Sequence, residues 1–488
     1  MPDLDEETRL GNGKTEILLN AFDMGVIGHL APGQWKTPGD QGAQKHTLEY
    51  WINLAKVLER GGFSSLFLAD SYGGHDTYGG SLDECIRRAS QFPISDPIIP
   101  ISAMAAATTH LTFGVTSSTT FEPPFILARR FSTLDHMTKG RIGWNIVTSW
   151  KKSAFKAIGL DDPIGHDERY QQADEYLRLL YKLWEGSWAD DAVSPSPKDD
   201  AFINPDKVRT IKHKGKYFKL ESPHILEPSL QRTPFLFQAG TSPAGIDFAA
   251  THAEAIFVSG FSPTLMGQGA AKVRAAAAAK GRDPRSIKAF GTVCPIVAPT
   301  DEEAQAKYVA LKKNASVIGA LVVISSISGI DLSKVPLDQD LSTVNDIKKD
   351  SVVSLRSALV QKSDDDDTVW TPRRVAEERS IGGFGALAVG SPTTVADILE
   401  KWVREADLDG FNLPHATTPG TFEDVVDLLV PELRRRGIYP EQLSGDAVPL
   451  TTRERVYGKG QARLRDDHVG SSYKFDVYKE EAAWEQKD

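Results

Sequence analysis

Short apolar segments typical of buried strands alternate with helical segments along most of the chain. Each of the short segments is rich in β-branched and large apolar residues and is paired with a helical pattern. Eight strands are predicted, at residues 15–22, 64–70, 111–119, 141–148, 233–240, 254–260, 287–299 and 409–414. Eight strand-and-helix units are typical of a (β/α)8 barrel, so we predict an α/β fold of the TIM-barrel class.

The segments between these strands carry the periodicity and the end signals of helices. Residues 47–63 are amphipathic and end at Gly61-Gly62, and the Ala-rich segment 264–280 stops at Gly281. Further helices are predicted at 97–109, 123–136, 167–184, 243–252, from 301 onward, 393–406 and 421–436.

A doubly wound sheet is the competing α/β arrangement, and it requires a glycine-rich phosphate turn after its first strand. The first strand here runs into "DMGVIGHLAPG" (23–33), which lacks the G-x-G-x-x-G spacing. The barrel is therefore favoured.

Two insertions interrupt the barrel pattern, and we expect residues 1–488 to form a single barrel domain that carries them, with a C-terminal tail from about 438. The first, at about 186–232, contains "VSPSPKDD" and is expected to form a small hairpin. The second, at about 315–390, holds the apolar run 316–330 and the acidic "SDDDD" (363–367), expected to be a solvated loop tip. An insertion of this length is typical of a lid or of a subunit contact, and both readings stay open.

Charge and cysteine content exclude several classes of protein. A formal net charge of −10 without a long basic stripe argues against nucleic acid as a partner. Two cysteines, Cys85 and Cys294, are too few for a disulfide scaffold and fit a reducing compartment. The polar, acidic N-terminus is no signal peptide, and the longest apolar run is too short to span a bilayer. We therefore expect a cytoplasmic protein with no membrane contact.

Familiar catalytic and metal-binding motifs are missing from the sequence. No C-x-x-C, H-E-x-x-H or EF-hand spacing occurs, so no metal site is expected. No G-x-S-x-G occurs either, which leaves a serine hydrolase without its nucleophile turn.

Small polar residues follow the ends of several predicted strands, where the chemistry of a TIM barrel collects. Asp70 follows the second strand, Thr148-Ser149-Trp150 the fourth and "AGTSPAG" (239–245) the fifth, while His29 lies in the loop after the first. Because a pair of carboxylates is missing, these residues suit a bound polar cofactor better than acid–base hydrolysis.

The segment "AGTSPAG" is the strongest local signal. Gly240 permits close approach of the backbone, and Thr241 and Ser242 offer hydroxyl and amide groups where a helix begins at about Pro243. Such a helix start is a natural phosphate site, but a plain N-cap followed by proline has the same pattern. Purely structural roles are also open for three other residues: Asp70 as a turn cap, His29 as a hydrogen-bonded loop histidine and Tyr170 as a packing residue.

Six segments, spread in order over residues 15 to 470, resemble the nitrilotriacetate, dibenzothiophene-sulfone and long-chain alkane monooxygenases, a group of the bacterial-luciferase-like flavin enzymes. The block around 122–151 is the most specific of them. The segments are "NAFDMGVIGH", "LFLAD", "EPPFILARRFSTLDHMTKGRIGWNIVTSW", "HDERYQQADEYLRLLYKLWEGSW", "QRTPFLFQAGTSPAG" and "DGFNLPHATTPGTFEDVVDLLVPELRRRG".

The resemblance implies a two-component monooxygenase that receives FMN (as FMNH2) from a separate NAD(P)H:flavin reductase. Its C4a-peroxyflavin, formed with O2, would oxygenate a small organic substrate, and a homo-oligomer (dimer or tetramer) is expected. An F420-dependent oxidoreductase of the same superfamily is disfavoured because the motifs follow the FMN branch. A non-catalytic flavin-binding subunit is disfavoured because every motif at the strand ends is present.

The resemblance also implies roles for individual residues. Asp70 corresponds to a flavin contact, and Ser149 and Trp150 to the wall beside the isoalloxazine. His29, near the substrate side of the ring, and Asn145, which points into the barrel mouth, are the catalytic candidates. The residues that correspond to the phosphate end are Tyr170, Ala239, Gly240, Thr241 and Ser242.

Two positions depart from the pattern of some members of that group. Val26 stands where some have cysteine, and Trp150 where some have histidine. A mechanism that needs the cysteine is therefore not available, and the identity of the substrate does not carry over.

Overall fold

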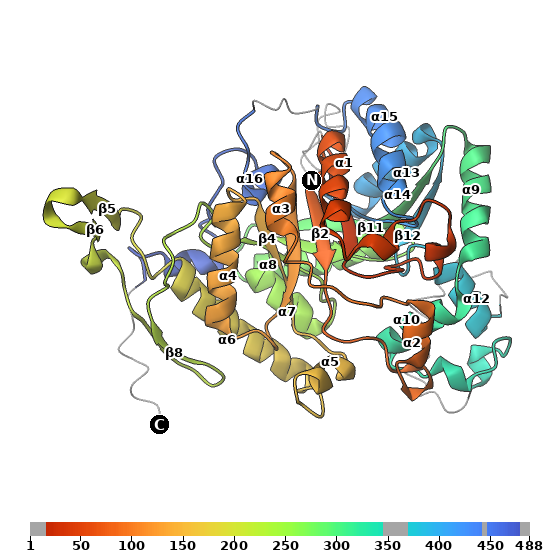
Figure 1. Ribbon diagram of the computed structural model, residues 1–488, viewed down its shortest axis with the longest axis horizontal. Coiled ribbons are helices and arrows are strands. Elements are labelled where there is room, and N and C mark those ends of the chain that lie inside the picture. The colour runs from red at the N-terminus through yellow and green to blue at the C-terminus, as the bar shows by residue number, and fades with distance from the viewer. Residues whose placement is uncertain (1–15, 345–368, 442–446, 479–488) are drawn as a thin grey trace.

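All eight predicted strands are present, and they close into a parallel barrel in the computed structural model, which describes residues 16–344, 369–441 and 447–478 (Figure 1). Their order around the barrel is β1-β2-β3-β4-β9-β10-β11-β13, and β13 pairs with β1. The strands are β1 (Leu18–Met24), β2 (Ser65–Ala69), β3 (Thr112–Ser118), β4 (Ile142–Val147), β9 (Phe235–Gln238), β10 (Ala255–Val258), β11 (Lys288–Val297) and β13 (Gly410–Pro414). The predicted fold class is confirmed.

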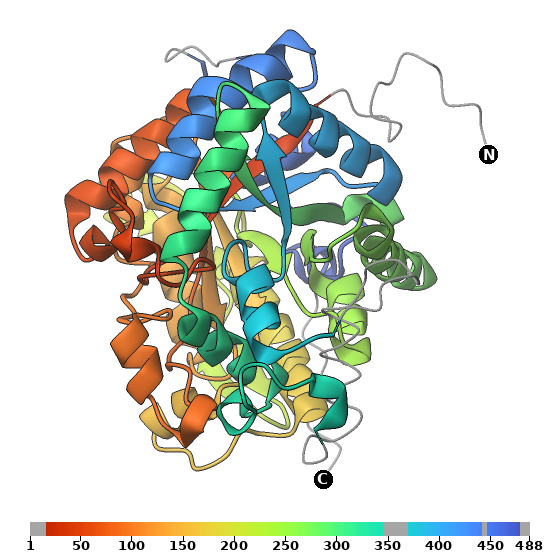
Figure 2. The same cartoon turned by 90° about the vertical axis from the view of Figure 1, so that its right-hand side faces the viewer.

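The predicted helices lie outside this barrel (Figure 2). They are α1 (Leu48–Gly61), α3 (Ile101–Ala106), α4 (Pro124–Met137), α6 (His166–Trp184), α7 (Pro243–His252), α8 (Pro263–Ala279), α9 (Asp301–Asn314), α13 (Pro392–Ala406), α14 (Gly420–Asp424) and α15 (Val430–Arg435). The last two were predicted as one helix, but a π-helical turn, Val425–Leu429, separates them. Pro431 explains the break because it has no N–H to continue the hydrogen-bond ladder.

Several short elements were not predicted, among them α12 (Pro372–Arg379) and α16 (Thr452–Tyr457), which are described below, and three that lie beside the barrel strands. The strand β12 (Ala386–Gly390) lies within the second expected insertion and pairs with the second half of β11, from Val293 to Val297. The helices α2 (Asp83–Arg88) and α5 (Lys152–Ala157) lie in the loops after β2 and β4. Each is only five or six residues long, which is too short for a hydrophobic period to be recognised.

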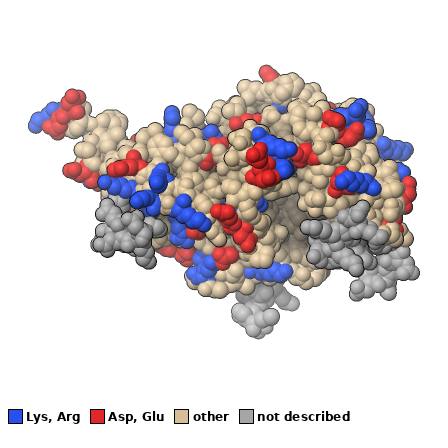
Figure 3. Space-filling view, turned by 90° about the horizontal axis from the view of Figure 1, so that it is seen from below, with Lys and Arg blue, Asp and Glu red and all other residues tan. Residues whose placement is uncertain are grey.

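The first insertion forms two hairpins where one was expected. They consist of β5 (Val193–Ser196) with β6 (Ala201–Ile203) and of β7 (Ile211–Lys214) with β8 (Lys219–Ser222). The β5–β6 hairpin projects from one end of the molecule (Figure 1), and its tip carries acidic and basic side chains (Figure 3). On the coloured part of the face shown in Figure 3, the two signs of charge are interspersed.

The second insertion buries its apolar run within the chain itself. Residues 317–328 form α10 (Val317–Ser328), which packs against α12 (Pro372–Arg379) and α2. Ala320, Leu321 and Ile324 are each at most 2% exposed. The acidic run 363–367 lies outside the described residues. Among the described helices, no single one is long and apolar enough to cross a membrane, although α9 and α10, bent by 81°, would pass such a test as a pair.

Phenylalanine rings fill the interior of the barrel. Phe67, Phe237 and Phe257 lie against one another, with the last two stacked at 5.6 Å. Gly143 makes room for them, since a Cβ there would lie 2.7 Å from the Phe237 ring. The glycine in the middle of a strand thus serves close packing, and the barrel is a filled core and not a pore.

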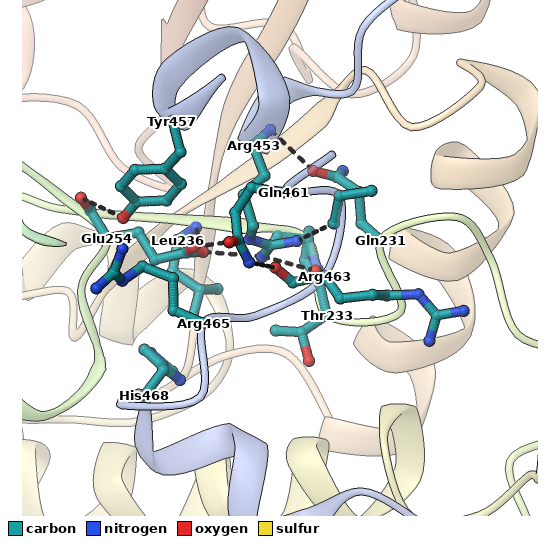
Figure 4. A network of polar contacts seen from close by, with 12 residues as sticks. Gln231, Thr233, Leu236, Glu254, Arg453, Tyr457, Gln461, Arg463, Arg465 and His468 are labelled. Atoms are coloured by element: carbon teal, nitrogen blue, oxygen red, sulfur yellow. Dashed lines mark hydrogen bonds and ion pairs between the residues drawn. The ribbon is translucent and has the colours of Figure 1, made fainter. Parts of the chain in front are cut away.

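The amino-terminal end of the barrel is closed by a segment from the end of the chain, α16 (Thr452–Tyr457). Arg453 is fully buried and donates to both carboxylate oxygens of Glu254, at 2.7 and 2.9 Å (Figure 4). It also donates to the carbonyls of Thr233 and Ala462. The network ties the expected C-terminal tail to the first residues of β9 and β10.

Candidate active site

A cavity of about 350 Å³ opens where the barrel strands end, at their carboxyl termini. The ends of β1, β2, β4 and β9 contribute to its wall, together with residues from α5, α6 and α7. This is the end of a TIM barrel at which active sites are built. The volume lies within the range of small-molecule sites.

Seven of the ten residues that the sequence singled out line this cavity. They are His29, Asp70, Ser149, Trp150, Tyr170, Ala239 and Gly240. Thr241 and Ser242 follow directly on the wall segment, with Thr241 exposed and Ser242 partly buried. Asn145 lies deeper, inside the barrel. The structure therefore brings together residues that are up to 211 positions apart in the chain, from His29 to Gly240.

The Tyr170 hydroxyl and the loop after β9 form a tight cradle. A Cβ at Gly240 would overlap the Tyr170 hydroxyl and the Gln238 amide, and one at Gly245 would lie 2.9 Å from the same hydroxyl. Ser242 caps α7 by accepting a hydrogen bond from the Gly245 N–H at 3.1 Å. Burial raises the pKa of Tyr170, so the phenol remains a hydrogen-bond donor. The N-cap interpretation of Ser242 is thus observed, and its side chain also neighbours Tyr170.

Ser149 adopts a strained backbone conformation at the exit of β4. Its φ of 45° lies in the left-handed region, which a residue other than glycine seldom adopts. The side chain exchanges a hydrogen bond of 2.8 Å with Ser118 at the end of β3. Such strain is concentrated at functional sites. The neighbouring Trp150 is 46% exposed, at the mouth of the cavity.

The Asp70 carboxyl group is held partly neutral by its surroundings. Burial raises its pKa to about 7, and the more distant charges of Asp96 and Glu122 act in the same direction. The Ser71 N–H donates to Asp70 Oδ1 at 2.7 Å and opposes that shift, as does the charge of Lys151. Asp70 therefore changes its charge near neutral pH, which is unusual for a carboxyl group.

His29 lies on the other side of the cavity as a neutral imidazole. It is 2% exposed, its ring packs edge-on against Phe22 at 4.6 Å, and burial lowers its pKa well below the usual value. Its Nδ1 has no partner among the described residues. The backbone carbonyl of His29 accepts a hydrogen bond from Gln91 Nε2, whose Oε1 contacts His75. The backbone at His29 is thus anchored, the ring is packed against Phe22, and Nδ1 has no partner in the described part of the chain.

Asn145 does not line the cavity. Its Nδ2 donates to Thr116 Oγ1 at 2.8 Å, inside the barrel, and its Oδ1 is buried without a partner in the described part of the chain. Residues alternate along β4, so Trp144 packs outward against Phe131 and Tyr176 while Asn145 points inward.

A buried ionic cluster lies behind His29. Lys45 Nζ contacts Asp23 Oδ1 and lies 3.4 Å from His415 Nε2, which is itself 2.8 Å from the same carboxylate oxygen. Burial would raise the pKa of Asp23, but Lys45 and His415 hold it well below its usual range. Asp23, His29 and His415 could by spacing hold a metal ion. The Lys45 ammonium already supplies a positive charge between Asp23 and His415.

Several residues of the cavity wall were missed by the sequence reasoning. Lys151 directly follows the predicted wall segment 148–150, and Gln238 directly precedes the segment 239–245. Extending each segment by one residue would have included them. Met24 lies at the end of β1, in the segment that leads to His29. Tyr72 and Gln91 come from the long connection after β2, where no sequence signal marks them.

Comparison with known proteins agrees with this architecture. A family model described as "Luciferase-like monooxygenase" matches residues 27–410. The dimethyl-sulfide monooxygenase of Hyphomicrobium sulfonivorans is 45% identical, over 95% of this chain and 95% of that protein. The long-chain alkane monooxygenase of Geobacillus thermodenitrificans is 43% identical, over 94% of this chain and 98% of that protein.

A solved structure extends the agreement to three dimensions. The crystal structure of a riboflavin lyase with modified FMN and riboflavin has a TM-score of 0.83 at 33% identity. It covers 94% of this chain and 99% of that one. The resemblance inferred from the motifs is confirmed: the chain belongs to the luciferase-like monooxygenase family and is a flavin-dependent monooxygenase.

Proposed function

We propose that the protein binds reduced FMN in the cavity at the carboxyl end of the barrel and uses O2 to oxygenate a small organic substrate. The observation that carries this proposal is the convergence of His29, Asp70, Ser149, Tyr170 and Gly240 on one cavity. They come from five separate parts of the chain: the loop after β1, the ends of β2, β4 and β9, and the helix α6.

The donors and acceptors of the wall fit such a cofactor. Tyr170, Gly240 and Ser242 form a cradle of hydroxyl and amide groups at a helix start, which suits a phosphate. Ser149 carries a hydroxyl along the wall between that cradle and Asp70, as a ribityl chain would require. Two buried atoms without partners in the described part of the chain, His29 Nδ1 and Gln238 Oε1, would be satisfied by a polar ligand.

The bound flavin supplies the oxidising chemistry when it reacts with O2, and the protein supplies binding, orientation and protection from water. Phe22, Met24, Leu30, Ala69 and Phe248 form the apolar part of the wall and exclude water. His29 is neutral and held by its neighbours, so it can accept or donate a hydrogen bond without carrying charge into the cavity.

A flavin that must be reduced requires a supplier, and we propose a separate NAD(P)H:flavin reductase as the second component. Both cysteines, Cys85 and Cys294, are buried and free, as expected for a protein of the cytoplasm. We also propose that the protein forms a homo-oligomer, either a dimer or a tetramer. Light scattering of the purified protein measures its oligomeric state.

Anaerobic titration tests the cofactor. The purified protein is titrated with photoreduced FMN, with oxidised FMN and with reduced F420, and binding is followed by fluorescence. Reduced FMN should bind most tightly. Binding of F420 alone would point to the deazaflavin oxidoreductases and against the proposal.

Oxygen labelling tests the reaction. A flavin reductase, NADH, FMN and 18O2 are supplied with dialkyl sulfides, n-alkanes, aryl sulfones and N-carboxymethyl amines. One 18O atom should enter a product of one of these classes. Tight binding of reduced FMN without substrate-dependent 18O incorporation in any class would favour a non-catalytic flavin-binding subunit.

A further inference from the structure

Lys151 is a partly buried cation that has no anionic partner within the described residues. Among the described residues that line the cavity it is the one lysine or arginine. Its Nζ donates to the Gly73 carbonyl at 3.3 Å and lies 6.0 Å from the centre of the Trp150 ring. In the described part of the chain, no ion pair within 4.0 Å involves Lys151. Both of its close contacts are therefore electrically neutral.

Two other lysines, one next to Lys151 in the chain and one in the barrel interior, are paired. Lys152, the next residue, contacts Asp162 at 2.5 Å on the surface, and Lys45 contacts Asp23 in the interior. Burial lowers the pKa of the Lys151 ammonium to about 8, and Cys85, Asp70 and Asp76 oppose that shift only from a distance. Burial of a cation without an anion costs stability, which an anionic ligand would recover.

The position of this ammonium separates it from the phosphate cradle. Lys151 follows β4 and reaches Gly73 in the connection after β2, whereas Gly240 follows β9 and lies against the hydroxyl of Tyr170 on α6. In the barrel, β3 and β4 lie between β2 and β9. A flavin whose phosphate occupies the cradle would therefore leave the ammonium free for a second ligand.

We propose that Lys151 binds an anionic group of the substrate, so that the protein oxygenates an organic acid, a carboxylate or a sulfonate, whose apolar part contacts the cavity wall. This inference rests on the proposed function and adds the chemical class of the substrate to it. Apolar side chains that line the same cavity include Phe22, Met24, Leu30, Trp150 and Ala154.

The groups around Lys151 set the pH dependence of such binding. Asp70, with a pKa near 7, is largely uncharged below neutral pH and then does not repel an anion. His75 stays neutral because burial lowers its pKa to about 3, and burial raises the pKa of the Cys85 thiol. The Tyr72 phenol keeps its proton in this range, because burial and the neighbouring Glu122 raise its pKa. Affinity for an anion should fall as the pH rises through the Asp70 pKa and then through the pKa of Lys151, near 8.

Three variants separate the charge from the rest of the side chain. Lys151→Met removes the charge and keeps the length, Lys151→Arg keeps the charge, and Lys152→Met removes the neighbouring surface cation as a control. The FMN-loaded proteins are titrated by calorimetry with hexane-1-sulfonate, hexanoate and 1-hexanol at pH 6.5 and 9.0. FMN and riboflavin affinities are measured for each variant by fluorescence quenching.

Both anions should bind the wild-type protein more tightly than hexanol at pH 6.5, and should lose affinity at pH 9.0. In Lys151→Met their affinity should fall about 10- to 100-fold, as expected when a charged hydrogen bond is lost, while hexanol is unaffected. Lys151→Arg should retain most of the affinity, and Lys152→Met all of it.

Three results would overturn the assignment. Anions that bind no better than hexanol would show that the Lys151 ammonium does not favour anionic ligands. Equal anion affinity in Lys151→Met and the wild type would show that another group binds the anion. A fall in FMN affinity in Lys151→Met without a fall in riboflavin affinity would assign the charge to the flavin phosphate. Failure of the wild type to bind any flavin would instead contradict the proposed function, and titration of the flavin-free protein would still test Lys151.

Discussion

Arg453, at the amino end of the barrel, differs from the groups that face the cavity at the carboxyl end in how its hydrogen bonds are satisfied. At the amino end, the guanidinium of Arg453 meets Glu254 and backbone carbonyls with each of its three nitrogens. At the carboxyl end, His29 Nδ1 and Gln238 Oε1 have no partner among the described residues, and Lys151 has only neutral contacts. Satisfied groups stabilise a fold, whereas unsatisfied ones cost stability unless a ligand completes them. The comparison therefore separates a structural end from a functional end.

The ionic cluster behind His29 shows that position at the carboxyl end does not by itself make a site. Asp23, Lys45 and His415 lie at strand ends or close to them, yet they are buried and bonded to one another. None of these three residues lines the cavity of the candidate site. The difference between the two ends predicts a graded set of mutational effects.

The largest effect is expected at the amino end. Arg453→Met leaves the buried Glu254 carboxylate without its partner, which should lower the free energy of unfolding by about 3–5 kcal/mol. Urea denaturation measures it. Arg463→Met is the control, because it removes an ion pair with Asp190 between two exposed side chains. It should lower the free energy of unfolding by about 0–1 kcal/mol. Equal losses in the two variants would show that burial of the Arg453–Glu254 pair adds nothing to its contribution.

At the carboxyl end, Gly240→Val fills the cradle with a side chain that must displace the Tyr170 hydroxyl. Overpacking of this kind costs about 1–3 kcal/mol, and here it should appear as a loss of FMN affinity of about 10- to 100-fold. Fluorescence quenching measures the affinity. Gly165→Ala, where a Cβ meets no atom within 4 Å, should leave the FMN affinity unchanged and cost only the small stability expected at the N-cap of α6. Unaltered FMN binding in Gly240→Val would move the phosphate away from the cradle.

A charge at the same cradle should have a somewhat smaller effect. Ser242→Glu puts a carboxylate beside the proposed phosphate, and repulsion of like charges should weaken FMN about tenfold. Ser242→Ala removes the same N-cap without adding charge, and serves as the matched control. Riboflavin, which has no phosphate, should bind Ser242→Glu as well as it binds Ser242→Ala. If riboflavin is weakened equally, the charge acts through structure and not through the phosphate.

The smallest effect is a pH dependence of stability from Asp70. Its folded pKa, about 7, lies above the unfolded value of about 4, so the folded state retains the proton longer. Stability should therefore fall as the pH rises from about 4 to about 7, and Asp70→Asn should abolish that fall. Because the side chain is partly exposed, we expect Asp70→Asn to raise the free energy of unfolding by about 1 kcal/mol at pH 8 and to leave it unchanged at pH 4. Thermal unfolding at the two pH values measures it, and a gain of the same size at both would contradict the raised pKa.

Most of the barrel was predictable because strand and helix periods are local properties of the chain. The ends of α7 coincide with the predicted 243–252, and β4 lies within the predicted 141–148. The strand β12 and the break before α15 were not predictable in the same way. β12 is defined by pairing with a distant half of β11, and the break depends on one proline in a long amphipathic segment.

The site was predictable to the extent that strand ends converge. That rule, with the family motifs, placed His29, Asp70, Ser149 and Tyr170 near one another. That rule did not predict which side chains face the cavity. Asn145 was expected there but points into the barrel and bonds to Thr116, whereas Lys151 was not expected there and lines the cavity. The direction of a side chain at a strand end depends on the turn that follows, and the sequence does not specify that turn.

The sequence by itself determined the order of the strand-and-helix units, the family and the segments that supply the cavity wall, because these depend on local periodicity and on matching motifs. The tertiary structure decided which buried groups find partners. Arg453 meets a carboxylate 199 residues away, Lys45 meets one 22 residues away, and Lys151 meets none within the described part of the chain. Pairing of this kind depends on distances across the barrel, and it separates the groups that hold the fold together from those left free to bind a ligand.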